Sequence, residues 1–253
     1  MNELERMTWR EAREKLRSAR LGVIPTGSCE QHGPHMSLAT DTEIATAFAR
    51  RLTEDLGEVA LLCPRVPYGL SEHHMAFAGT LTLRPDTFVA VLLDLFESLR
   101  HWNIRRALIV NGHGGNIDAL KIVARMARRD AGMVVGSVMW SQLAADAIQE
   151  RVNSARYGHA CEIETSVALV LAPRCVFQDR IEEPQPVGPE DPLTDPPRAV
   201  ADSPIWFAEW TRNGSLGDPR LSNEELGRAV VEVAYGRALS FARQLADKEL
   251  DPL

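Results

Sequence analysis

The sequence lacks an apolar run long enough to span a bilayer, and its charged residues 1–6 are not followed by the apolar core of a signal peptide. We therefore expect a cytoplasmic protein without a membrane partner. The sequence also lacks a basic excess, because 28 Lys and Arg residues stand against 35 Asp and Glu residues and give a net charge of −7. A nucleic-acid partner normally requires a basic face, so none is expected.

Cysteine is scarce, and its spacing follows no pattern. The chain has four cysteines: Cys29, Cys63, Cys161 and Cys175. Without paired spacing or a secretory context, they are expected to be buried free thiols. A chain of 253 residues can bury a sizeable core, and we expect residues 1–253 to form a single domain.

Apolar segments of strand type alternate with helical patterns along the chain. The expected strands are residues 21–25, 59–63, 106–110 and 133–140, and the expected helices are 8–20, 41–56, 85–99, 116–129 and 222–247. In the third helix, Leu95 belongs to an apolar stripe that we expect in the core. Thr8 with Glu11 has capping-box spacing at the start of the first helix, and Ser222 begins a capping-box pattern for the last one. The alternation is typical of an α/β fold with a mostly parallel sheet.

The polar stretch of residues 26–41 lies between the first strand and its helix, at the sheet edge where ligands gather in such folds. Glu30 and His32 are two residues apart and face the same side of an extended segment, while Asp41 returns at the helix start. Carboxylates and imidazoles together suit Zn, Mn or Fe ions, and one carboxylate can bridge two ions. The alternative is a polar loop in which Asp41 caps the helix.

A second polar loop, residues 111–116, follows the buried strand 106–110 and precedes a helix. His113 is its candidate ligand. The glycines around it could instead cradle a phosphate, which would make the protein a nucleotide-binding protein, although neither the dinucleotide nor the P-loop spacing is present.

A third ionisable group precedes the apolar segment 167–172 and contains His159, Glu162 and Glu164. Buried carboxylates at this point need a metal, a base or an arginine as partner. Glu162 and Glu164 share a side in an extended segment but diverge on a helix, so the sequence leaves open which one points inward.

Two long segments lack regular patterns. Residues 64–80 form a polar loop of a length that is often functional. Residues 178–220 are rich in proline, and we expect an ordered excursion or a subunit-contact loop because Ile205, Trp206, Phe207 and Trp210 supply apolar anchors.

The assembled motifs resemble those of the creatininase (creatinine amidohydrolase) family. They occur in the family's order along most of the chain, at residues 27–35, 40–41, 71–74, 79–80, 111–116 and 164–166. The resemblance implies a three-layer α/β/α sandwich with a mostly parallel central sheet. It also implies a homo-oligomer, a hexamer, that acts on a small-molecule substrate.

By this resemblance the site would hold two divalent metal ions per chain (Zn, Mn or Fe). Glu30, Asp41 and His113 would bind one ion, and His32 with the shared Asp41 would bind the other. The resemblance also implies that His159 serves in proton transfer and that Ser71 and Trp140 line the substrate pocket, with a place in the core as the alternative for Trp140. We expect Glu164, or else Glu162, to complete the second site and assist catalysis, and Gly114 to bind substrate. We expect a neighbouring carboxylate to set the tautomer of His159.

The remaining histidines lie around this set. His35 is expected to form hydrogen bonds behind the ligands. His73 and His74 are expected at the entrance, or simply on the surface. The sequence departs from the creatinine-hydrolysing members at Gly115, where those members carry a glutamate ligand of the second metal.

The function that follows is hydrolysis of a C–N amide bond in a small cyclic amide, a formamide or a related substrate, by water activated at the two metals. Relatives that share the glycine pair include a deformylase of formamidopyrimidine nucleotides and a peptidase of peptide-cofactor maturation, so a creatininase-like peptidase is an alternative. Another is a degenerate member that acts as a binding or scaffold protein, because Gly115 replaces a ligand.

Overall fold

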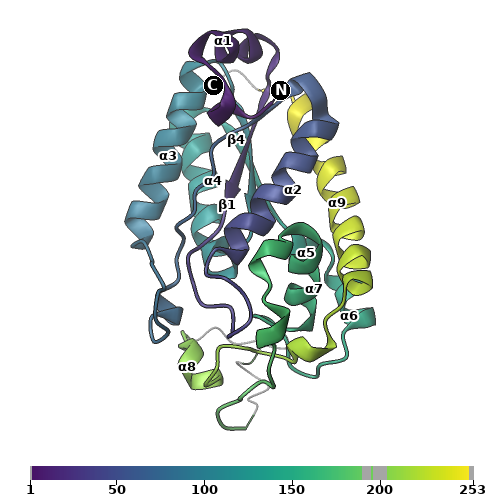
Figure 1. The fold of residues 1–253 in the computed structure, drawn as a ribbon. Coiled ribbons are helices and arrows are strands. Elements are labelled where there is room, and N and C mark those ends of the chain that lie inside the picture. Colours follow the sequence, from purple (N-terminus) through teal and green to yellow (C-terminus); the bar gives the residue numbers. More distant parts are fainter. Residues whose placement is uncertain (1, 190–194, 196–203, 251–253) are drawn as a thin grey trace.

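The computed structural model describes residues 2–189, 195 and 204–250. Its centre is a four-stranded parallel sheet in the order β2-β1-β3-β4 (Figure 1). The strands are β1 (Leu21–Thr26), β2 (Ala60–Leu62), β3 (Arg106–Asn111) and β4 (Val134–Met139). Each matches a strand expected from the sequence, with ends shifted by a few residues at most. The α/β class and the parallel sheet are therefore confirmed.

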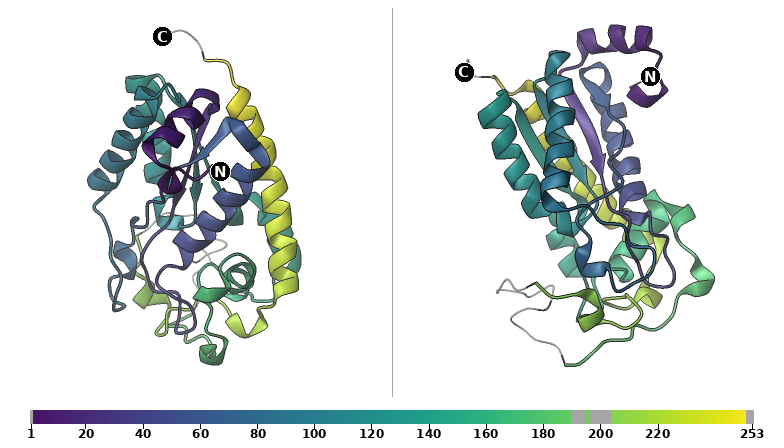
Figure 2. Two further views of the ribbon diagram at one scale, coloured as in Figure 1. Left: turned by 45° about the horizontal axis from the view of Figure 1, so that its top comes forward. Right: turned by 90° about the vertical axis from the view of Figure 1, so that its left-hand side faces the viewer.

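Helices cover both faces of the sheet (Figures 1 and 2). One face packs against α3 (Pro85–His101) and α4 (Ile117–Ala131), and the other against α2 (Thr40–Leu56), α7 (Glu162–Leu171) and α9 (Glu224–Asp247). Shorter helices are α1 (Trp9–Ser18), α5 (Trp140–Leu143), α6 (Ala145–Arg151) and α8 (Phe207–Trp210). This arrangement is the three-layer α/β/α sandwich.

Alternation along the central strands separates the two core layers. Val23 and Leu108 pack with α2, α7 and α9, whereas Ile24 and Ile109 pack with α3 and α4. All four side chains are fully buried, because successive residues of a strand point to opposite faces. The continuous apolar strands thus reflect a sheet that is covered on both sides.

Two details of the helices differ from the expectation. Leu95 in α3 is 36% exposed, while the neighbouring Leu92 and Phe96 are buried, so the apolar stripe is narrower than its sequence pattern suggests. The capping residue of α9 is Asn223, whose side chain accepts a hydrogen bond from the Leu226 backbone; Ser222 does not cap. At α1 the predicted capping box between Thr8 and Glu11 is present.

The parallel register places the polar loops together. Thr26 at the end of β1 pairs with Asn111 at the end of β3, and Asn111 pairs with Met139 at the end of β4. The segments that follow these strands therefore leave the sheet at one edge. All four cysteines are free, and Cys29 alone among them is partly exposed. Within the described residues, no helix has the length and apolar character needed to cross a bilayer.

Candidate metal centre

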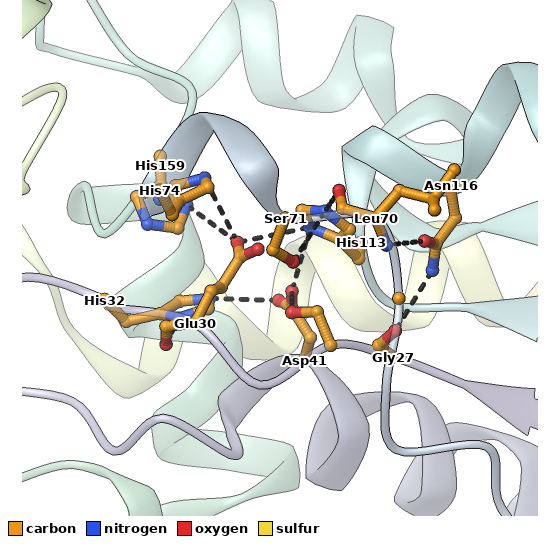
Figure 3. Close-up of polar contacts among 12 residues, drawn as sticks. Gly27, Glu30, His32, Asp41, Leu70, Ser71, His74, His113, Asn116 and His159 are labelled. Carbon is orange, nitrogen blue, oxygen red and sulfur yellow. Dashed lines mark hydrogen bonds and ion pairs between the residues drawn. The ribbon is translucent and has the colours of Figure 1, made fainter. Parts of the chain in front are cut away.

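Asp41 lies at the middle of a buried cluster of carboxylates and imidazoles (Figure 3). It sits in the first turn of α2, but Ala39 occupies the capping position and no side chain caps that helix, so the capping alternative is wrong. The α2 backbone at Asp41 is packed against Gly112: a Cβ atom on Gly112 would lie 2.2 Å from the Asp41 carbonyl oxygen. Glycine at this position lets the β3 loop reach Asp41.

One side of the cluster joins Glu30, Asp41 and His113. The Nδ1 atom of His113 lies 3.1 Å from Glu30 Oε1 and 3.2 Å from Asp41 Oδ2. Its other nitrogen, Nε2, donates to the Leu70 carbonyl oxygen at 2.8 Å. A ring whose outer nitrogen is held by a carbonyl presents the inner nitrogen to the site, as is usual for metal-binding histidines.

The other side joins His32, Asp41 and Glu164. His32 Nε2 lies 3.0 Å from Asp41 Oδ1 and 3.9 Å from Glu164 Oε1. The two oxygens of Asp41 therefore face different imidazoles. The donor atoms of each of three groups lie close enough to hold an ion: Glu30, Asp41 and His113; His32, Asp41 and Glu164; and Glu30, His32 and His159.

Glu164 and Glu162 diverge because both lie on α7. Glu162 Oε1 accepts hydrogen bonds from the backbone nitrogens of Asn153 and Ser154, at 2.6 and 2.7 Å, and so serves the preceding loop. Glu164 turns to the cluster, where its Oε2 accepts from Ala160 N at 2.6 Å. The structure thus brings Glu164, and not Glu162, to the candidate site.

His159 presents Nδ1 to the cluster, 3.7 Å from Glu164 Oε2 and 3.9 Å from Glu30 Oε1. Its Nε2 lies 2.7 Å from the Gln31 carbonyl oxygen, which can only accept a hydrogen bond. A backbone carbonyl therefore sets the tautomer, in place of the carboxylate that we expected. Burial and the nearby His32 charge lower the pKa of His159 to about 3, so the ring is neutral at pH 7.

Burial and neighbouring charges shift the pKa values of the side chains in the cluster. Burial lowers the pKa of His32, but the Asp41 and Glu164 carboxylates outweigh this effect and raise it to about 10. The pKa of His113 is raised in the same way by Glu30 and Asp41, against the effect of burial. Burial raises the pKa of Glu164. In the metal-free chain, protons on the imidazoles thus balance part of the negative charge.

The donor set fits divalent metal ions. Glu30 is 1% exposed, and its Oε2 has no hydrogen-bond partner among the described residues, while only imidazole nitrogens, of His113 at 3.1 Å and of His74 at 3.4 Å, approach Oε1. A buried carboxylate oxygen without a donor is costly, and a cation would stabilise it. Mixed carboxylate and imidazole ligands are typical of zinc and manganese sites.

The remaining predicted residues lie at different distances from the cluster. Ser71 Oγ is 3.4 Å from His113 Nε2, and Gly114 is exposed with open space around its Cβ position. His35 Nε2 lies 2.9 Å from the hydroxyl of Thr165, the neighbour of Glu164, which agrees with a hydrogen bond behind the ligands. Trp140 is buried in the core layer of α2, α7 and α9, and its indole nitrogen has no hydrogen-bond partner in the part of the chain that the structure describes. Its contact with substrate stays a prediction.

His74 lies deeper in the site than the entrance position expected from the sequence. It is 1% exposed, so the alternative of a surface position is wrong for this residue. Its Nε2 lies 3.4 Å from Glu30 Oε1, and its Nδ1 accepts from Gln31 Nε2 at 2.9 Å. His73 is partly exposed and stacks on His113 with ring centroids 5.7 Å apart. The adjacent histidines were visible in the sequence, but nothing local indicated that the second one turns inward.

Phe207 was also missed as a site residue. It was expected only to anchor the proline-rich excursion, of which the structure describes residues 178–189, 195 and 204–220. Its ring stacks on His74 with centroids 4.0 Å apart and meets His159 edge-on at 4.7 Å. Phe207 therefore forms an apolar wall against the imidazoles. No signal in the sequence links residues so far apart.

The loop around His113 does not favour a phosphate site. The backbone of Asp41 packs closely against Gly112, and the ring of His113 faces the carboxylates of Glu30 and Asp41. Carboxylates within reach repel a phosphate. The nucleotide-binding alternative therefore loses its support.

The chain is similar to known proteins in sequence and in fold. The creatinine amidohydrolase family model matches residues 5–242. The mycofactocin precursor peptide peptidase of Mycobacterium ulcerans is 35% identical over 220 residues, which cover 82% of this chain and 78% of that protein. The creatinine amidohydrolase of Pseudomonas putida is 27% identical over 246 residues, or 90% of each chain.

A solved structure of creatininase with manganese is also similar. Its TM-score is 0.78 at 25% identity, covering 98% of this chain and 99% of that chain. The extent of the family match and the identity to the peptidase lead to one conclusion: this chain belongs to the creatininase family of metal-dependent amidohydrolases.

Proposed function

We propose that this protein hydrolyses a C–N amide bond with two divalent ions per chain, zinc, manganese or iron. The observation that carries the proposal is the position of Asp41, whose Oδ1 faces His32 while its Oδ2 faces His113. A carboxylate placed between two ligand groups is suited to bridge two ions. Glu30, Asp41 and His113 would hold one ion, and His32, Asp41 and Glu164 the other.

Bound divalent ions lower the pKa of water and polarise a carbonyl group, which is the chemistry that amide hydrolysis requires. The chain itself supplies the proton carrier. His159 keeps its Nε2 proton on the Gln31 carbonyl oxygen and has a free lone pair on Nδ1. It can therefore accept a proton at Nδ1 and deliver it to the departing nitrogen.

In this proposal Phe207 shields the imidazoles of the site from water. Its ring covers His74 and His159 on one side and thereby limits the access of water to the imidazoles. Exclusion of water strengthens the electrostatic interactions of the buried carboxylates with a substrate amide. Ser71 and Gly114 lie beside His113, and we assign them to the substrate-facing edge of the site.

We place a peptide amide first among the substrates. Support comes from the identity to mycofactocin precursor peptide peptidases, 35% against 27% for the creatinine amidohydrolase. The crowding at Gly115 also favours a peptide over creatinine as substrate. A Cβ atom there would lie 2.3 Å from the Leu70 carbonyl oxygen and 2.5 Å from His113 Nε2. A glutamate does not fit this backbone, so Glu164 would take over as ligand.

We also propose that the protein forms a homo-oligomer. Exposed aromatic side chains of Trp9, Tyr68 and Trp102 line an apolar groove of about 660 Å³ between α1 and α3. Contiguous exposed apolar surface is characteristic of interaction sites. Light scattering after size-exclusion chromatography tests this part directly.

The test of the function is metal content by elemental analysis, together with hydrolysis assays on peptides, creatinine and formamides. We expect about two ions per chain and cleavage of peptide amides in the wild type. Asp41→Ala should lose most of both, whereas Glu43→Ala should keep both, because the Glu43 side chain in the same helical turn is 40% exposed and pairs with Arg65. A metal-replete wild type without amide hydrolysis would contradict the proposal.

A further inference from the structure

The side-chain amide of Gln31 is held in one orientation by two backbone groups. Its Oε1 accepts a hydrogen bond from the Gly33 backbone nitrogen at 2.9 Å, and its Nε2 donates to the Gly214 carbonyl oxygen at 3.4 Å. A backbone nitrogen can only donate and a carbonyl oxygen can only accept, so the two ends of the amide cannot be exchanged. The second hydrogen of Gln31 Nε2 therefore remains for His74 Nδ1, which lies at 2.9 Å.

This contact fixes the proton of His74. Because Nδ1 accepts a hydrogen bond, the ring has a single proton and carries it on Nε2. The ring is also held in place: it stacks on Phe207 with centroids 4.0 Å apart, and the His74 backbone nitrogen donates to the Ser71 carbonyl oxygen at 2.9 Å. Its protonated Nε2 lies 3.4 Å from Glu30 Oε1 (Figure 3).

His113 and His159 approach the same oxygen of Glu30 with lone pairs. Their Nδ1 atoms lie 3.1 and 3.9 Å from Glu30 Oε1, but in each ring Nε2 donates to a backbone carbonyl oxygen. A neutral imidazole has one proton, so neither Nδ1 atom can donate to Glu30 in that form. Among the described residues, His74 is therefore the donor that remains for Glu30 when the lone pair of His113 is bound to an ion.

We propose that His74 is a positioning residue: its Nε2 donates to Glu30 Oε1 and holds that carboxylate in place as a metal ligand, while Gln31 holds His74 in the tautomer that this requires. The inference rests on the proposed function, in which Glu30 binds one of two ions. Hydrogen bonds of this kind orient the ligands of metal sites, and removing one lowers metal affinity about 10–100-fold.

The variants His74→Asn and His74→Gln separate the two nitrogens of the ring. The amide in His74→Asn takes the place of Nδ1 and can still accept from Gln31, but it offers no N–H to Glu30. The amide in His74→Gln reaches the place of Nε2 and can donate to Glu30, but it loses the bond to Gln31. A positioning role therefore predicts that His74→Gln keeps the metal affinity that His74→Asn loses.

The first measurement is the zinc affinity of the full-length protein, by competition with a chromophoric chelator, with elemental analysis for the number of bound ions. We expect His74→Asn to bind one of the ions about 10–100-fold more weakly, and His74→Gln to bind both nearly as tightly as the wild type. Tm of the metal-free variants shows whether either change acts through stability, in which case the affinity would follow Tm in both.

The tautomer is measured separately, by NMR of metal-free protein with ¹⁵N-labelled histidine. The His74 signals are identified by their loss in His74→Asn. We expect the proton on Nε2 in the wild type and a proton on Nδ1 in Gln31→Glu, whose carboxylate can only accept. A wild-type ring that carries its proton on Nδ1 would overturn the role of Gln31 and leave Glu30 without its donor.

The outcomes separate this inference from the proposed function. Zinc affinity that falls equally in both His74 variants, in neither, or only in His74→Gln overturns the positioning of Glu30, even if the protein cleaves amides. Weak binding by His74→Asn alone, in a protein that cleaves no amide, supports the positioning and contradicts the proposed function. A wild type that binds no zinc overturns both.

Discussion

The Nε2 atom of His159 lies 2.7 Å from the carbonyl oxygen of Gln31. Since a carbonyl can only accept, this contact fixes the proton on Nε2 and turns the lone pair of Nδ1 to Glu30 and Glu164. Gln31 follows Glu30 directly in the sequence. One loop therefore supplies a carboxylate of the cluster and also orients the imidazole that we assign to proton transfer.

The two glutamates of α7 should respond differently to substitution. Glu164→Gln removes a charge that faces His32, so we expect loss of bound metal and of activity with a small effect on stability. Glu162→Gln weakens the two backbone hydrogen bonds at residues 153 and 154, so we expect a lower Tm, corresponding to about 1–3 kcal/mol, with metal content retained. Thermal unfolding and elemental analysis of both variants check this. The reverse pattern would assign the ligand role to Glu162.

Metal binding should release protons at neutral pH. In the metal-free chain the pKa of His32 is raised to about 10 from 6.5, and that of His113 is also raised, so both rings are protonated at pH 7. A metal binds only the deprotonated nitrogen, and the apparent affinity should therefore increase as the pH rises from 6.5 towards 10. Isothermal titration calorimetry in buffers of different ionisation enthalpy measures the protons released. A binding enthalpy independent of buffer would contradict the prediction.

The same shifts predict how the stability of the metal-free chain depends on pH. A raised pKa in the folded state means that folded protein binds more protons than unfolded protein. The contribution of His32 is fully present below pH 6.5 and is lost as the pH rises through about 10. Tm measured after chelation should fall over this range, whereas the metal-loaded protein should show a smaller change.

Gly115 and Gly114 form a matched pair for substitution by alanine. A Cβ atom at Gly115 would lie 2.3 Å from the Leu70 carbonyl oxygen, and one at Gly114 would meet nothing within 4 Å. We expect Gly115→Ala to lower the free energy of unfolding by about 1–3 kcal/mol and to reduce metal binding through displacement of His113. Gly114→Ala should leave both unchanged. Chemical denaturation measures the free energy of unfolding, and elemental analysis measures the bound metal. Equal stability and equal metal content in the two variants would contradict the crowding at Gly115.

Phe207 and Trp206 are adjacent but differ in environment. Phe207 is buried against His74 and His159, whereas Trp206 is 47% exposed. Phe207→Leu should admit water to the imidazoles and shift the pH profile of kcat/KM by raising the pKa of His159, because burial is the main cause of its low value. Trp206→Leu should leave the profile in place. An unchanged profile in both variants would remove Phe207 from the site.

Local patterns already specified the elements that carry the site. The apolar strands 21–25 and 106–110 predicted that Glu30, His32 and His113 follow strands of a parallel sheet, and the helical pattern after Asp41 placed that carboxylate at a helix start. These features follow from periodicity, which acts over a few residues. The Thr8 capping box was equally readable because its partners are three residues apart.

Contacts between distant segments were decided only by tertiary structure. Gln31 bonds to the ring of His74 and to the carbonyl oxygen of Gly214, and Phe207 stacks on His74 across more than half of the chain. Loops 64–80 and 178–220 have no periodicity that could predict such contacts, since packing against the sheet edge orients their side chains. The inward direction of Glu164 likewise depended on where α7 begins. Because α7 starts at Glu162, both glutamates lie on the helix and point in different directions. The sequence by itself thus determined the ligand types and the strand ends that bear them, whereas the surroundings of His74 and Phe207 came from packing between segments far apart in the chain.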